Sequence, residues 1–175
     1  MPPPNRAPSL LAVLVGLVAF VPSAHACWEQ AGAKYGVAPQ LLFAIAKAES
    51  GLNPRAIGRN RNGSDDIGLM QINSSHLPRL ARYGINQASL FDPCTNINVG
   101  AWILSDSFAR HGASWEGVGA YNAACSSLRG VQCRTARTRY AWRVYRKLYE
   151  TDTKARNAFA PQAPMPIILS ARVTP

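Results

Sequence analysis

The sequence contains no apolar run long enough to form a stable membrane span. Its longest run, residues 10–21, has twelve residues, whereas a spanning helix needs about 20. One positive charge precedes this run, and Ala24-His25-Ala26 provides a small-x-small motif directly before Cys27. This order is typical of a secretory signal peptide, so we predict that residues 1–26 are removed after Ala26 and that the mature chain is periplasmic. Lipid attachment at Cys27 is the less favoured alternative, because the residues before it are unusual for a modification site.

Cysteine and histidine are scarce, and their spacing is not that of a metal site. The chain has four cysteines and three histidines, without a CxxC or HxxxH motif. We therefore expect no metal and no cofactor. In an exported chain an even number of cysteines indicates disulfides, and four cysteines allow three pairings. Cys125 and Cys133 enclose a short loop rich in Ser, Arg and Gly, which favours the pairs Cys125–Cys133 and Cys27–Cys94.

Acidic residues are also few: Asp and Glu total 9 against 19 Lys and Arg. Such an excess of positive charge usually indicates a nucleic-acid partner, but export makes that partner improbable, and we expect none. An anionic wall polymer or a membrane surface is the natural counterpart. The alternative is that the basic segment at residues 129–147 is only a solvated helix face that keeps the protein soluble.

The rest of the sequence predicts a single, mostly α-helical domain at residues 27–150, with a small β element near residues 56–72. No repeats interrupt it, and we expect a monomer. Pro and Gly mark helix ends, and Ser caps helix starts. The predicted helices are residues 28–35, 39–50, 74 or 75 to 83, 95–110, 114–122 and 135–149. Residues 151–175 contain APQAPMP, and we predict a disordered tail there.

Glu49 stands out because it shares a helix stripe with core residues. Leu42, Ile45 and Glu49 are spaced i, i+3 and i+7, which places them on the inward face. Burial and the negative C-terminal end of the helix dipole should both raise the pKa of this carboxyl. A carboxylic acid that keeps its proton near neutral pH can protonate a leaving oxygen. The alternative is a Glu that reaches solvent at a frayed helix end.

Two further motifs bring amides and an aromatic ring towards the same region. IGLMQINSSH at residues 67–76 predicts a packed turn that places Gln71 and Asn73 near a cleft. GAYNAA at residues 119–124 offers Tyr121 and Asn122 beside small residues. Amides of this kind bind sugar hydroxyls and acetamido groups. Taken singly, each motif is more often a packing or capping feature.

Together and in this order, the motifs resemble the lysozyme-like superfamily, and within it the soluble lytic transglycosylases of family 23. The matching segments are ES at 49–50, GLMQIN at 68–73 and AYNA at 120–123. DPCTNINVGAWIL at residues 92–104 resembles the small exported members associated with secretion systems, such as invasion protein IagB. The resemblance covers about residues 27–148.

The resemblance implies an α-rich lysozyme-like fold with a groove for a peptidoglycan glycan strand. It implies cleavage of the bond between N-acetylmuramic acid and N-acetylglucosamine, with Glu49 as acid and then base, and a 1,6-anhydromuramic product. It assigns substrate binding to Ser50, Met70, Gln71, Tyr121 and Asn122, and a later cleft aromatic to Tyr140. It also implies an assembly partner, such as a type III or type IV secretion system or a type IV pilus.

Asp66 leaves a hydrolytic alternative open. Animal-type lysozymes carry their second catalytic carboxylate at a similar place, and a retaining hydrolase needs the two carboxyls about 5–5.5 Å apart. Asp66 would otherwise only support a turn. The sequence lacks the eight-cysteine framework of those lysozymes, which favours the transglycosylase. A third hypothesis is a peptidoglycan-binding assembly factor whose catalysis is dispensable.

Overall fold

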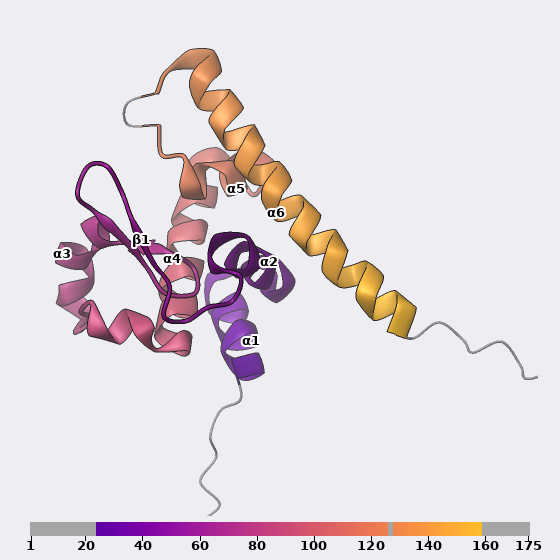
Figure 1. The fold of residues 1–175 in the computed structure, drawn as a ribbon, viewed down its shortest axis with the longest axis horizontal. Coiled ribbons are helices and arrows are strands. Elements are labelled where there is room, and N and C mark those ends of the chain that lie inside the picture. Colours follow the sequence, from indigo (N-terminus) through magenta and orange to yellow (C-terminus); the bar gives the residue numbers. More distant parts are fainter. Residues whose placement is uncertain (1–23, 126–127, 159–175) are drawn as a thin grey trace, which may run out of the picture.

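The computed structural model describes the backbone of residues 24–125 and 128–158. Side chains are described for residues 26–125 and 128–150. Five longer helices form the body: α1 Ala24–Tyr35, α2 Pro39–Ser50, α4 Pro93–His111, α5 Trp115–Asn122 and α6 Gly130–Ala158. Short helical segments connect β3 to α4: η1 Ser74–His76, α3 Leu77–Leu80, η2 Ala81–Tyr83 and η3 Ala88–Phe91. Figure 1 shows α6 running across the body and continuing beyond it. The mostly helical class is confirmed.

The predicted β element is a small antiparallel sheet. Its strands are β1 Ile57–Arg59, β2 Asp65–Ile67 and β3 Ile72–Asn73, in the order β1-β2-β3. The register pairs Gly58 with Asp66 and Asp66 with Asn73. Asp66 therefore lies in the central strand, on the side of the molecule away from α1.

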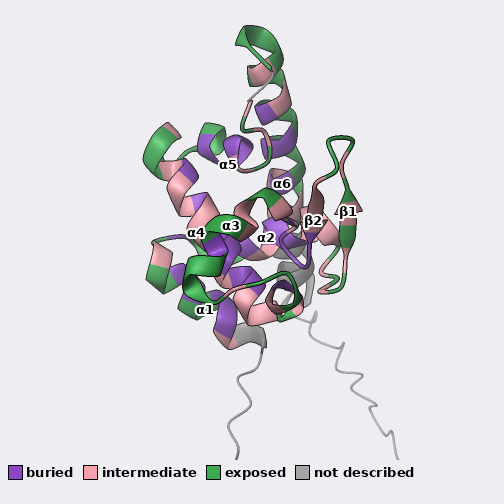
Figure 2. Ribbon diagram, turned by 90° about the vertical axis from the view of Figure 1, so that its left-hand side faces the viewer, coloured by how far each residue is buried: buried purple, intermediate pink, exposed green. Residues whose placement is uncertain are grey.

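The core forms where α2 is surrounded by α1, α4 and α6. Leu42 and Ile45 are fully buried, together with Ile97 and Leu104 of α4 and Val144 of α6. Figure 2 shows these buried segments at the centre, with the β1 edge of the sheet exposed. Because α2 is enclosed by other helices, its inward face carries Glu49 into the interior, as the stripe of apolar residues predicts.

The predicted C-terminal ends of α1, α2, α4 and α5 agree with the structure to within a residue, whereas the helix before Gly84 and the last helix differ. Gly51 ends α2 with a left-handed φ of 64°, and Ser114 caps α5 by accepting a hydrogen bond from Gly117 N. The predicted helix before Gly84 is broken into η1, α3 and η2, and its cap is Asn73 rather than Ser74 or Ser75. The last helix is longer than we predicted.

The segment that we predicted to be a disordered tail begins as helix: α6 continues to Ala158. Residues 151–158 contain neither Pro nor Gly, so nothing in the sequence ends the helix there. Residues 159–175, and residues 1–23 of the predicted signal peptide, lie outside the described part of the chain. Within the described part, no helix is both long and apolar enough to cross a bilayer.

Both predicted disulfides are present. Cys27 is joined to Cys94, which ties the start of α1 to α4, and Cys125 is joined to Cys133 across the α5–α6 connection. The first closes a much longer stretch of chain, 67 residues against 8. It therefore restricts the unfolded chain more strongly.

Candidate active site

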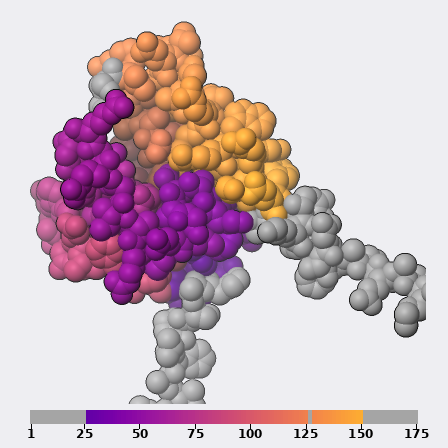
Figure 3. All heavy atoms as spheres, in the orientation of Figure 1, coloured from indigo at the N-terminus to yellow at the C-terminus, as the bar shows by residue number. Residues whose placement is uncertain are grey.

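A groove of about 720 Å³ lies between the small sheet and the α5–α6 connection. In Figure 3 the purple atoms of the β1–β2 hairpin rise on one side and the orange start of α6 on the other. Glu49, Asp66 and Gln71 line the groove, as do Tyr121 and Asn122. The structure thus brings together most of the residues that the sequence singles out. Further amides along the same surface come from Asn60, Asn62 and Asn73.

Glu49 is held on the groove wall formed by α2 and α6. Its side chain is only 9% exposed. The Tyr140 hydroxyl donates a 2.5 Å hydrogen bond to Oε1, and an Arg143 guanidinium nitrogen lies 3.7 Å from Oε2. Tyr140 and Arg143 are three residues apart on α6, so one face of that helix reaches both carboxyl oxygens.

The pKa of Glu49 is raised above its ordinary value. Burial is the largest cause, because a carboxylate in this site loses hydration, and the negative charge of Asp66 acts in the same direction. The Tyr140 hydrogen bond and the Arg143 charge oppose the rise, since both stabilise the ionised form. The net direction agrees with the prediction from the helix stripe, although burial rather than the helix dipole is the main cause.

Two stacked tyrosines cover this carboxyl. The rings of Tyr121 and Tyr140 are 6.4 Å apart and nearly parallel, with 25° between their planes. The Tyr121 hydroxyl donates to Met70 O at 2.9 Å rather than to Glu49. Burial raises the pKa of both hydroxyls well above their ordinary values, and the Glu49 charge adds to the effect. Both phenols therefore stay protonated donors.

Asp66 lies on the opposite wall in a polar setting. Its Oδ1 accepts a 2.7 Å hydrogen bond from Asn73 Nδ2, and its Oδ2 accepts a 2.9 Å hydrogen bond from Asn60 Nδ2. Each carboxylate oxygen is thus occupied by an amide donor. The register that pairs β2 with β3 places Asn73 beside Asp66.

Ser50, Met70 and Gln71 differ in how they relate to the groove. The Ser50 hydroxyl donates to Leu69 O at 2.8 Å, which joins the end of α2 to the GLMQ turn, and Ser50 does not line the groove. Met70 is fully buried against Gly100, so the prediction of a cleft-lining side chain is wrong for it. Gln71 lines the groove, and its amide donates to Gly68 O at 2.8 Å.

A buried asparagine fixes the turn that carries these residues. Asn96 of α4 accepts from Met70 N at 2.8 Å and donates to Ile67 O and Leu90 O at 2.9 and 2.8 Å. Gly68 has a φ of 76°, and a side chain there would collide with the Asn96 amide. Sequence reasoning noted the DPCTNINVG segment only as part of a resemblance and missed this role.

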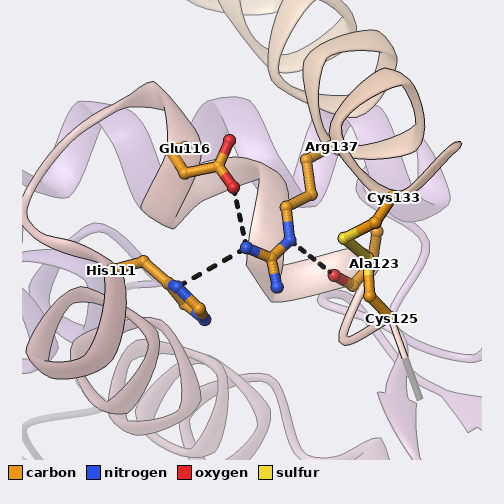
Figure 4. The surroundings of a disulfide bond; sticks show 6 residues. All are labelled: His111, Glu116, Ala123, Cys125, Cys133 and Arg137. Atoms are coloured by element: carbon orange, nitrogen blue, oxygen red, sulfur yellow. Dashed lines mark hydrogen bonds and ion pairs between the residues drawn. A yellow bond between two sulfur atoms is a disulfide. The ribbon is translucent and has the colours of Figure 1, made fainter. Parts of the chain in front are cut away.

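Arg137 fixes the wall that carries Tyr121 and Asn122. Its Nη1 donates to Glu116 Oε1 at 2.7 Å and its Nε donates to Ala123 O at 3.0 Å, with the Cys125–Cys133 disulfide beside it (Figure 4). Arg137 is buried, so it anchors α6 to the end of α5. Among the described residues, no cluster of acidic, histidine or cysteine side chains is suited to bind a metal ion.

Comparison with known proteins places this geometry in a family. The family model described as "Transglycosylase SLT domain" matches residues 26–141, two thirds of the chain. The chain belongs to the transglycosylase SLT domain family. It is a peptidoglycan lytic transglycosylase, with the lysozyme-like fold of that group.

Individual relatives of the SLT domain family agree with this assignment. Invasion protein IagB of Salmonella typhi is 49% identical over 135 residues, covering 75% of this chain and 82% of that protein. Protein IpgF of Shigella flexneri is 39% identical over 134 residues, covering 75% and 86%. An inactive mutant of the lytic transglycosylase Slt from Pseudomonas aeruginosa has a similar fold, with a TM-score of 0.56 at 22% identity, covering 78% of this chain and 24% of that one.

Several residues in or beside the groove of this SLT domain escaped sequence reasoning. Arg143 is the most important, because it approaches the Glu49 carboxyl. Its position three residues after Tyr140 is a signal that could have identified it once Tyr140 was placed in the cleft. His76 and Ile103 also line the groove, and burial lowers the pKa of His76. No motif in the sequence marks either residue.

Proposed function

We propose that Glu49 cleaves the β-1,4 bond between N-acetylmuramic acid and N-acetylglucosamine without water. Its carboxylic acid protonates the glycosidic oxygen, and the N-acetylglucosamine side leaves with that proton as a hydroxyl. The resulting carboxylate takes a proton from the 6-hydroxyl of the muramic residue, whose oxygen attacks the anomeric carbon. The product ends in 1,6-anhydromuramic acid, and Glu49 regains its proton.

The observation that carries this proposal is the buried setting of the Glu49 carboxyl, with a close donor at one oxygen and a more distant cation at the other. Tyr140 occupies Oε1 as a donor, so the acidic proton is expected on Oε2. Burial raises the pKa of this carboxyl, which favours its protonated form before the substrate arrives. After the proton leaves, Tyr140 and Arg143 stabilise the carboxylate until it accepts the next one.

The opposite wall supports the same mechanism. Both Asp66 oxygens accept amide hydrogen bonds, which hold this carboxylate in place on the sheet wall. The polar surface formed by Gln71, Asn73 and Asn122 suits sugar hydroxyls and acetamido groups.

Mass spectrometry of the fragments released from purified peptidoglycan tests this proposal, with Glu49→Gln as the inactive control. Fragments lighter by one water than hydrolysis products, and absent with the control, are the expected result. Reducing ends in the wild-type digest would contradict the non-hydrolytic step.

A hydrolytic muramidase is the second candidate, because Asp66 lines the same groove and its charge raises the pKa of Glu49. It requires the Asp66 carboxylate to lie close to the anomeric carbon of the bound sugar. The digest separates the two reactions by their products. An assembly factor with dispensable catalysis is the third candidate: Glu49→Gln would then retain biological function despite its loss of cleavage.

The biological setting is proposed as local opening of the wall for a secretion system or pilus. The name of one relative supports this, since it is an invasion protein and shares 49% identity with this chain. The Cys27–Cys94 disulfide suits an oxidising periplasm and uses the sulfur that lipid attachment at Cys27 would need. Fractionation of cells that express the full chain, with N-terminal sequencing of the mature protein, should give a periplasmic chain that starts at Cys27.

A further inference from the structure

The face of α6 that turns away from Glu49 carries an exposed row of aromatic rings. Trp142, Tyr145 and Tyr149 follow helical spacing, and Trp115 of α5 joins them. The ring centroid of Tyr145 lies 5.1 Å from that of Trp142, 5.3 Å from that of Trp115 and 4.4 Å from that of Tyr149. Despite these contacts, Trp142 is 58% exposed and Trp115 is 43% exposed.

The rings enclose a hollow of about 310 Å³, which is the size of a small-ligand site. Its walls are Trp115, Glu116, Thr138, Ala141, Trp142 and Tyr145. None of these residues lines the groove that contains Glu49. The hollow is therefore a separate site, on the opposite face of the helix that supplies Tyr140 and Arg143.

The hollow combines apolar and polar groups in the manner of a saccharide site. Trp115 and Trp142 both meet Tyr145 nearly edge-on, at 69° and 73° between ring planes, and all three rings line the hollow. Glu116 uses Oε1 for Arg137, and among the described residues Oε2 has no hydrogen-bond partner. Oε2 and the Thr138 hydroxyl can accept hydrogen bonds from sugar hydroxyls.

Charge next to the hollow selects the kind of saccharide. Arg139 and Arg146 are exposed and lie on one side of the aromatic row, seven residues apart on α6. A peptidoglycan strand carries carboxylates on its stem peptides, which these guanidinium groups can pair with. An anionic membrane fits less well, because the site is concave and one wall is a carboxylate.

We infer that this hollow is an accessory glycan-binding site that holds peptidoglycan away from the catalytic groove. A sugar ring stacks on Trp142 and Tyr145, and the two arginines hold the acidic substituents of the strand. The inference rests on peptidoglycan being the substrate, but it does not depend on which product forms.

The test measures binding of the full mature chain to purified sacculi by co-sedimentation, in the Glu49→Gln background so that the polymer is not cleaved. Trp142→Ala, or Trp142→Ser as a second variant, should weaken binding by about tenfold, as expected for an aromatic anchor. Tyr83→Ala removes an exposed aromatic ring on η2 and is the matched control. Arg139→Gln with Arg146→Gln should weaken binding more than Arg55→Gln with Arg82→Gln, which removes the same charge elsewhere.

The variants in an otherwise wild-type chain should cleave short soluble glycan strands at the normal rate, because the Glu49 groove is untouched. Unchanged sacculus binding by folded Trp142→Ala would overturn the inference. Loss of binding to phosphatidylglycerol vesicles without loss of binding to sacculi would also overturn it, in favour of a membrane surface. A shift from dimer to monomer on substitution would assign the face to a second copy instead. Failure of the proposed reaction is seen separately, as the wrong product from soluble strands.

Discussion

The two walls of the groove each present a carboxyl group, but in opposite surroundings. On the α2–α6 wall, Glu49 is buried beside tyrosine rings. The Tyr140 hydroxyl donates a hydrogen bond to one of its carboxyl oxygens, and the Arg143 guanidinium lies farther away, near the other. On the sheet wall, Asp66 is held by two amides in a polar network with Asn60 and Asn73. Burial on the apolar wall raises the pKa of Glu49, whereas two amide hydrogen bonds on the polar wall hold Asp66 in position.

This difference bears on the acid–base role proposed for Glu49. An acid that must donate and then recover a proton needs a setting in which neither form is strongly preferred. Burial favours the protonated form of Glu49, and Tyr140 with Arg143 favours the ionised form. The sheet wall has no such opposition, and its amides suit recognition of the sugar.

The strongest test of the comparison is Glu49→Gln. Glutamine keeps the size of the side chain and can still accept from Tyr140, but it cannot transfer a proton. Cleavage of peptidoglycan should fall by about 10³-fold or more, since general acid–base catalysis contributes about 10²–10⁴ for each role. Release of soluble fragments measures the loss, and circular dichroism checks that the fold is kept. Residual activity within a few-fold of wild type would mean that the apolar wall is not the catalytic one.

Tyr140→Phe addresses the balance within the apolar wall. Removing a charge-assisted hydrogen bond worth about 1.5–3 kcal/mol should lower the rate about tenfold at neutral pH. The same bond lowers the pKa of Glu49, so its loss raises that pKa further. Cleavage needs protonated Glu49 and falls as pH rises through its pKa, so the falling limb of the pH–rate profile should move to higher pH.

Tyr121→Phe is the matched control for that profile. The Tyr121 hydroxyl donates to Met70 O and makes no hydrogen bond to Glu49, so its loss should leave the limb in place. An equal shift in both variants would show that general loosening of the stacked rings, rather than the Tyr140 hydrogen bond, controls the titration.

Prediction from sequence succeeded where a regular helix carries the information. Pro39 and Gly51 set the ends of α2, and the stripe of Leu42 and Ile45 gave the direction of Glu49. It failed for Met70, whose cleft position was implied by the family resemblance and not by a helix or strand pattern, and the turn between Gly68 and Gln71 is irregular. Gln71 has a left-handed φ of 49°, so the alternation of a strand does not apply there.

The polar wall was harder to predict for a related reason. Asp66 was identified as a candidate, but its two amide partners depend on strand register and hairpin shape. Register in short polar strands is weakly specified by sequence pattern. The contact between Arg143 and Glu49 depends on how α6 crosses α2, which no local pattern determines.

Asp66→Asn sharpens the contrast between the walls with a smaller effect. Asparagine cannot accept two amide hydrogen bonds as well as a carboxylate, so the hairpin should loosen and cleavage fall by less than about tenfold. The anhydromuramic product should be unchanged. Fragment mass spectrometry with rate measurement checks both, and Asp65→Asn on the same strand is the control. A loss of about 10²-fold or more would make Asp66 a catalytic carboxylate.

The smallest effect concerns stability and comes again from Glu49. The pKa of Glu49 is raised in the folded chain. Below the unfolded pKa of about 4.3, Glu49 is protonated in both the folded and the unfolded state, so its ionisation does not affect the free energy of unfolding. As pH rises from there through the folded pKa, the carboxyl ionises more readily in the unfolded state than in the folded state. The free energy of unfolding therefore falls. Glu49→Gln removes this loss, so the variant should be more stable than wild type at neutral pH by about 1 kcal/mol or less. The difference should disappear in acid, and thermal unfolding from about pH 4 to pH 8 measures it.

Asp66→Asn, on the polar wall, is the comparison and should not gain stability. A Glu49→Gln variant that is less stable at every pH would mean that Tyr140 and Arg143 outweigh burial, and the apolar wall would then favour the ionised acid.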